Sequence, residues 1–155
     1  MPAIEVNGNR LAFDAFGAGS TVVCLHSSAS SARQWSSLSQ HLQAQHCIFT
    51  PDLPGYGTSH AVSGHAGPAI SAEADIISGL IEAWQEPVHL VGHSYGGAMA
   101  LQIALTRPEW VKSLTLIEPT VFNLLRNGVP GDRRLYAEVE ALRGRIAASV
   151  ASGDL

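Results

Sequence analysis

The sequence predicts an α/β fold built on a doubly wound, mostly parallel sheet. Four short runs, at residues 21–25, 47–50, 88–91 and 113–117, are apolar at nearly every position. A strand of that composition is buried on both faces, which is the condition of a parallel sheet covered by helices. Between the runs, apolar residues recur at helical spacing. Strands that alternate with helices in this way favour a doubly wound sheet.

The first 15 residues have a different rhythm and predict a β-hairpin. Apolar residues alternate with polar ones on both sides of Asn7-Gly8. Asn-Gly supplies the positive φ angles that a two-residue hairpin turn requires. We therefore expect an antiparallel pair of strands to precede the first buried strand.

Helices are expected in each interval between the buried strands. The apolar residues that define them are Trp35, Leu38 and Leu42, then Ile76, Ile77, Leu80, Ile81 and Trp84, then Met99, Leu101, Ile103 and Leu105. A proline at position 108 ends the third helix. After turns at residues 127–131, a more polar amphipathic helix is predicted from Leu135 to Val150. The expected boundary lies between a core at residues 1–119 and a segment at residues 120–155.

Composition excludes several classes of partner. The chain has 155 residues, a net charge of −4, 46% apolar residues and 14% charged residues. Nucleic acid is disfavoured as a partner, because phosphate binding needs a clustered basic surface. No apolar run approaches the length of a membrane helix, and the start of the chain does not resemble a signal segment. The two cysteines lie in apolar runs without metal-ligand spacing. We therefore expect a cytoplasmic protein with no membrane partner.

The residues Gly92-His93-Ser94-Tyr95-Gly96 match the pattern G-x-S-x-G. The match directly follows the predicted strand at residues 88–91 and precedes a predicted helix. This is the strand–turn–helix setting of a nucleophile elbow, in which the serine hydroxyl is exposed above the sheet. The alternative is an ordinary serine cap at the start of a helix. The placement favours Ser94 as a nucleophile.

The order of several motifs resembles the α/β-hydrolase family over nearly the whole chain. These motifs are His26-Ser27-Ser28 after a strand, Trp35, the run Asp52-Leu53-Pro54-Gly55-Tyr56-Gly57-Thr58-Ser59, the Ser94 elbow, and Leu116-Ile117-Glu118-Pro119. The resemblance implies the family's core as far as its sixth strand, with the start of a helical cap at residues 120–155. It also implies a serine hydrolase, because a dehalogenase of this fold would carry Asp at position 94.

By that resemblance, the backbone N–H groups of Tyr95 and Ser28 form an oxyanion hole. His26 and Ser27 belong to the same loop and are expected to contribute to oxyanion or substrate binding. One departure concerns position 27, where the family usually has glycine. Serine is less free than glycine to adopt a positive φ angle.

The general base is the missing part of the predicted site. The histidines are at positions 26, 41, 46, 60, 65, 89 and 93, and none follows Ser94. The family order is serine, then acid, then histidine. His93 is expected to point away from Ser94, and a structural hydrogen bond is expected for His26. Glu118, at the end of the sixth strand, is a candidate acid, with a pocket-lining or turn-capping carboxylate as the alternative.

The resulting prediction is a serine hydrolase that acts on a small ester- or amide-type acyl substrate through Ser94 and uses no cofactor or metal. Two alternatives stay open: a non-catalytic binding protein of this fold, and one half of a two-chain enzyme. The expected partners are therefore the acyl substrate and either a second copy, by self-association, or a complementing C-terminal segment. The sixth strand would form an exposed apolar edge, which predicts a low unfolding midpoint or self-association.

Overall fold

The computed structural model describes residues 1–62 and 69–153. The chain divides into two compact units, Met1–Thr120 and Val121–Leu155. All of the sheet lies in the first unit.

Six strands form one sheet in the order β1-β2-β4-β3-β5-β6. They are β1 (Ala3–Val6), β2 (Asn9–Phe16), β3 (Ser20–Leu25), β4 (His46–Pro51), β5 (Val88–His93) and β6 (Val111–Ile117). The pairs β1–β2 and β2–β4 are antiparallel. The pairs β3–β4, β3–β5 and β5–β6 are parallel. The predicted mostly parallel α/β sheet is confirmed.

The N-terminal hairpin has the predicted turn. Asn7 and Gly8 both have positive φ angles, of 50° and 75°. The two strands then pair in the register Ala3 with Ala12 and Val6 with Asn9. The local sequence therefore determines this turn, because Asn and Gly are the residues that tolerate its backbone.

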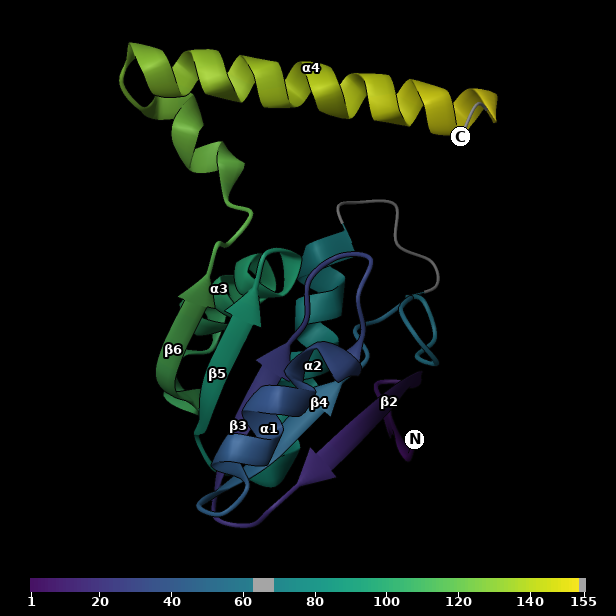
Figure 1. Ribbon diagram of the computed structural model, residues 1–155, viewed down its shortest axis with the longest axis vertical. Coiled ribbons are helices and arrows are strands. Elements are labelled where there is room, and N and C mark those ends of the chain that lie inside the picture. The colour runs from purple at the N-terminus through teal and green to yellow at the C-terminus, as the bar shows by residue number, and fades with distance from the viewer. Residues whose placement is uncertain (63–68, 154–155) are drawn as a thin grey trace. The chain divides into compact units, whose positions relative to one another are not determined.

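The two faces of the sheet are covered by different helices. α1 (Ser36–Leu42), preceded by the 3₁₀ turn η1 (Ala32–Trp35), lies on one face, and α2 (Ala69–Trp84) and α3 (Tyr95–Thr106) lie on the other (Figure 1). The alternation of β3 divides its side chains between the faces. Val22 and Cys24 pack with Trp35, whereas Val23 and Leu25 pack in the core that includes residues of α2 and α3.

β6 is the last strand on one side of the sheet. It begins after a short 3₁₀ turn, η2 (Pro108–Trp110), that follows α3. No residue of β6 is fully buried, and Ile117 is 41% exposed. The position of the predicted apolar edge is thus confirmed for the described strands, while its effect on unfolding or self-association stays a prediction.

The second unit contains η3 (Phe122–Asn127) and α4 (Pro130–Ser152). α4 begins with Pro130, and the Asp132 side chain accepts a 3.1 Å hydrogen bond from the Val129 N–H. Gly153, with φ 75°, ends the helix in the left-handed conformation. Asp132 therefore caps the helix. That this unit begins a cap stays a prediction.

Candidate active site

Ser94 occupies the turn between β5 and α3. Its backbone has φ 52° and ψ −113°. A positive φ at a residue other than glycine costs on the order of 1–3 kcal/mol and persists only where the surrounding structure fixes it. The strand–turn–helix setting is the one that the nucleophile elbow requires. The helix begins directly after Ser94, at Tyr95.

Glycines allow the elbow to pack directly against neighbouring backbone. A Cβ atom at Gly92 would lie 2.3 Å from the Gly96 carbonyl oxygen. A Cβ atom at Gly96 would lie 2.3 Å from the Leu25 carbonyl oxygen and 2.5 Å from that of His26. These separations exclude any side chain at either position. The elbow is thereby held against the loop that follows β3.

Backbone hydrogen bonds from β6, from the residues after it and from α3 fix Ser94. The Ser94 N–H donates to the Ile117 carbonyl at 2.9 Å. The Ser94 carbonyl accepts from the Thr120 N–H at 3.1 Å and from the Ala98 N–H at 3.0 Å. These bonds hold the strained conformation of Ser94 by both its donor and its acceptor.

The expected oxyanion donors lie on two segments that meet at the elbow. Tyr95 is the first residue of α3, where backbone N–H groups have no partner within the helix. Ser28 lies exposed on the loop after β3. The positive φ in this loop is at Ala29, with φ 55°, and Ser27 has none. The serine at position 27 is therefore compatible with the backbone of this loop, because its φ angle is not positive.

His26 is fully buried. Its Nε2 accepts a 2.9 Å hydrogen bond from the Leu53 N–H, so its Nδ1 carries the proton and donates to the Ser27 carbonyl at 2.8 Å. Burial lowers the pKa of His26, and the Ser27 carbonyl and the Asp52 charge partly oppose that shift. Both ring nitrogens have backbone partners, which is the structural role expected for this residue.

The motif at residues 52–59 builds a turn around a buried carboxylate. Asp52 accepts the N–H groups of Ala32 at 2.9 Å and Thr58 at 3.1 Å. A Cβ atom at Gly57 would lie 2.0 Å from this carboxylate. Ser59 Oγ donates to the Asp52 carbonyl at 2.7 Å. Asp52 therefore links this turn to η1, which begins at Ala32.

Two neighbours of the site were not predicted from the sequence. Gln34, on η1, bonds both Ser27 and His93. Glu73, on α2, is 7% exposed and accepts the Tyr95 hydroxyl at 3.0 Å. No sequence signal identifies Gln34. Glu73 could have been found, because it is a carboxylate on the apolar side of the helix at residues 69–84 and a buried carboxylate needs a partner.

The Tyr95–Glu73 pair has shifted acidities. Burial raises the pKa of the Glu73 carboxyl, and the hydrogen bond from Tyr95 partly opposes this. Burial raises the pKa of the Tyr95 phenol, and the charge of Glu73 raises it further. The neutral hydroxyl of Tyr95, the residue that follows Ser94, thus anchors this side chain to Glu73 on α2.

Glu118 follows β6 directly and has a positive φ of 44°. Its side chain is 88% exposed, and its Oε2 lies 4.0 Å from His93 Nε2. The structure therefore places Glu118 beside His93, which is the residue that precedes Ser94. Its role as an acid stays a prediction.

His41, His46 and His89 lie away from the elbow or have structural partners. His46 begins β4 and His89 is near the start of β5, whereas Ser94 follows the end of β5. His41 Nδ1 bonds the Ser37 carbonyl within α1. His65 lies outside the described residues. Among residues 1–62 and 69–153, no group of three His, Cys, Asp or Glu side chains is arranged to hold a metal ion.

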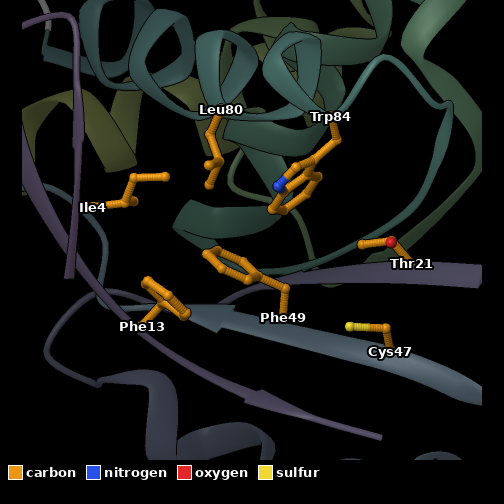
Figure 2. A pocket seen from close by; sticks show the side chains of 7 residues that line it. All are labelled: Ile4, Phe13, Thr21, Cys47, Phe49, Leu80 and Trp84. Atoms are coloured by element: carbon orange, nitrogen blue, oxygen red, sulfur yellow. The ribbon is translucent and has the colours of Figure 1, made fainter. Parts of the chain in front are cut away.

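An apolar cavity of about 270 Å³ lies between α2 and the sheet (Figure 2). It is lined by Ile4, Phe13, Thr21, Cys47, Phe49, Leu80 and Trp84. Phe49 stacks on Phe13 and meets the edge of Trp84. A binding site usually combines apolar walls with several converging polar groups. This cavity offers one hydroxyl, one thiol and one indole N–H, and its lining does not include Ser94, so it is not the candidate active site.

Comparison with known proteins identifies the family. The sequence pattern of the α/β hydrolase fold matches residues 20–144. The chain belongs to the α/β hydrolase fold family. Among solved structures, an epoxide hydrolase from Vigna radiata superposes with a TM-score of 0.70 and 27% identity, over 74% of this chain and 37% of that one.

Two relatives of this α/β hydrolase have esterase or lipase names. This chain is 31% identical over 118 residues to a pimeloyl-[acyl-carrier protein] methyl ester esterase of Aeromonas salmonicida. The match covers 75% of this chain and 44% of that protein. The chain is 36% identical over 102 residues to the lipase LipV of Mycobacterium tuberculosis, covering 64% of this chain and 37% of that protein. The chain thus spans less than half the length of these relatives.

Within the part of the chain that the structure describes, no helix has both the length and the apolar composition that a membrane crossing requires.

Proposed function

We propose that this α/β hydrolase is a serine hydrolase of small ester- or amide-type acyl compounds, with Ser94 as its nucleophile. The observation that carries the proposal is the strained backbone of Ser94 at the junction of β5 and α3. Strain of this kind is retained where function needs it. The esterase and lipase relatives support an ester as the substrate.

The proposed reaction begins when Ser94 Oγ adds to the substrate carbonyl carbon and its proton passes to a base. The electron pair of the carbonyl double bond moves to oxygen. The N–H groups of Tyr95 and Ser28 then stabilise this oxyanion. The base then gives its proton to the leaving oxygen or nitrogen, the C–O or C–N bond breaks as the carbonyl re-forms, and an alcohol or amine departs, leaving an acyl group on Ser94. Water adds to that acyl-enzyme in the same way and releases the acid.

The base is the component that these residues do not supply. No histidine follows Ser94, and both ring nitrogens of His26 are occupied by backbone groups. We propose that a complementing C-terminal segment provides the base. The alternative is a non-catalytic acyl-binding protein of the same fold.

A fluorophosphonate probe with added imidazole separates these proposals. Ser94 Oγ forms a bond to phosphorus, fluoride leaves, and the hydroxyl proton passes to the base. We expect free imidazole to accelerate adduct formation at Ser94, since it replaces the missing base. The adduct is located by mass spectrometry. Ser94→Ala removes it, and Ser37→Ala, at an exposed serine of α1, does not.

The outcomes are distinct. Fast labelling without imidazole means that a base exists within the chain or its oligomer. No labelling at Ser94 under either condition contradicts the nucleophile and supports the binding-only alternative. Turnover of an activated aryl ester, compared with Ser94→Ala at each imidazole concentration, tests whether the adduct is followed by hydrolysis.

A further inference from the structure

One side chain joins the two segments that carry the expected oxyanion donors. Gln34 Oε1 accepts hydrogen bonds from both the N–H and the hydroxyl of Ser27, each at 3.0 Å. Gln34 Nε2 bonds His93 Nδ1 at 3.1 Å. Ser27 precedes Ser28, and His93 precedes Ser94. The glutamine therefore holds the residue before an expected oxyanion donor and the residue before the nucleophile.

The orientation of the carboxamide follows from its partners. The Ser27 backbone N–H can only donate, so the atom facing it must be the amide oxygen. The amide nitrogen then faces His93 and must donate. His93 Nδ1 is consequently an acceptor, and the ring proton lies on Nε2. That N–H is the one nearest Glu118, at 4.0 Å between heavy atoms.

The placement of Gln34 is itself fixed. It lies on η1, whose first N–H donates to the buried Asp52 carboxylate. The next residue, Trp35, is 5% exposed and packs in the core on that face of the sheet. The amide therefore projects from an anchored turn and can determine the position of its partners.

The close packing of Gly96 against the loop after β3 does not fix the outer part of that loop. Gly96 rests on the carbonyls of Leu25 and His26, so the base of the loop is set by backbone contact. The outer part, from Ser27 to Ala29, includes the left-handed residue Ala29. Two side chains hold Ser27. His26, in the same loop, donates to its carbonyl, and Gln34, from η1, accepts from its N–H and its hydroxyl. Gln34 is therefore the contact that ties Ser27 to another element.

We propose that Gln34 is a positioning residue that sets the distance between the oxyanion loop and the Ser94 elbow. The proposal rests on the proposed role of Ser94. Gln34 does not touch the reacting atoms in this proposal. It acts through Ser27 and His93, and displacements of about 1 Å at such positions can cost roughly 100-fold in rate.

Gln34→Met tests the hydrogen bonds at nearly constant side-chain length. We expect amide hydrogen exchange at Ser27 to accelerate by about three- to tenfold, because one hydrogen bond of modest net strength is lost. Gln40→Met, the same change at an exposed position of α1, leaves exchange at Ser27 unchanged. Unchanged exchange in Gln34→Met would overturn the proposal.

Gln34→Glu tests the orientation of the network. A carboxylate still accepts from Ser27, but its second oxygen cannot donate to His93. The neutral imidazole then moves its proton from Nε2 to Nδ1 and donates. Nitrogen chemical shifts of the His93 ring report this change of tautomer. If wild type and Gln34→Glu have the same tautomer, Gln34 does not hold His93 as proposed.

The functional arm uses fluorophosphonate labelling of Ser94 with imidazole present. We expect Gln34→Met to lower the maximal labelling rate by about tenfold or more, with the half-saturating probe concentration little changed. An unchanged maximal rate alongside faster Ser27 exchange would overturn the positioning role. If wild type itself is not labelled, the role of Ser94 fails, and so does the positioning role that rests on it. The exchange and tautomer measurements then still decide whether the Gln34 network exists.

Discussion

The helices α2 and α4 have similar amphipathic spacing but opposite environments. In α2, Ile77, Leu80 and Ile81 are almost completely buried. In α4, Leu135, Leu142 and Ile146 are each about half exposed. Spacing of apolar residues therefore predicts that a helix forms and which side is apolar. It does not predict how much of that side is removed from water, and that area determines the stabilisation.

Truncation of one leucine on each helix should give the largest difference in the free energy of unfolding. Leu80→Ala should lower the free energy of unfolding of the Met1–Thr120 unit by about 2–5 kcal/mol, because it leaves a cavity in a packed core. Leu142→Ala should change that unfolding transition by less than about 1 kcal/mol, since its side chain is 53% exposed. Urea unfolding followed by tryptophan fluorescence measures both. Equal losses would contradict the comparison.

Two carboxylates extend the comparison to hydrogen bonds. Asp52→Ala leaves the buried N–H of Ala32 and the partly buried N–H of Thr58 without their partner. An unsatisfied buried N–H costs about 1–3 kcal/mol. Asp132→Ala removes one exposed helix cap, which is worth about 0.5–2 kcal/mol. We expect Asp52→Ala to reduce the urea midpoint more. Asp52→Asn, which keeps one acceptor, should lose less than Asp52→Ala, and an equal loss would argue against the hydrogen bonds.

Glu73 should make the stability of the Met1–Thr120 unit depend on pH. Burial, the larger cause, raises its folded pKa above 4.5. The folded state then binds the proton more tightly than the unfolded state does, so this contribution to stability is present at low pH and is lost as pH rises through the folded pKa.

Glu73→Gln is expected to flatten that part of the stability profile above pH 4.5, since the amide does not ionise and its oxygen still accepts from Tyr95. Urea midpoints measured at a series of pH values provide the test. Glu138→Gln, on α4, is the matched control and should leave the profile of the first unit unchanged. A profile for Glu73→Gln parallel to that of wild type would show that the pKa is not raised.

The sequence predicted the fold because its signals are local. The Asn7-Gly8 turn, the buried strands and the helical spacing each depend on near neighbours, and the topology follows from their order. The elbow was predictable for the same reason, since it lies between consecutive elements. The bonds of Gln34 and Glu73 join residues 7 to 59 positions apart. No periodic pattern encodes such contacts, which depend on the packing of whole elements.

The smallest expected effect concerns two ion pairs with the same 2.9 Å separation. Arg107 Nε meets Glu82 Oε1 across α2 and the end of α3, with both side chains about 40% exposed. Arg143 Nη2 meets Glu140 Oε2 within α4, where the arginine is 76% exposed. Exposed pairs contribute about 0–1 kcal/mol, and pairs within a helix lie near the lower end.

Double-mutant cycles with Arg→Met and Glu→Gln should give a larger coupling for Arg107–Glu82, because it joins elements distant in the sequence and is less hydrated. Raising the salt concentration should reduce the Arg143–Glu140 coupling more. A coupling for Arg143–Glu140 that equals or exceeds the other would mean that solvent exposure does not rank these pairs.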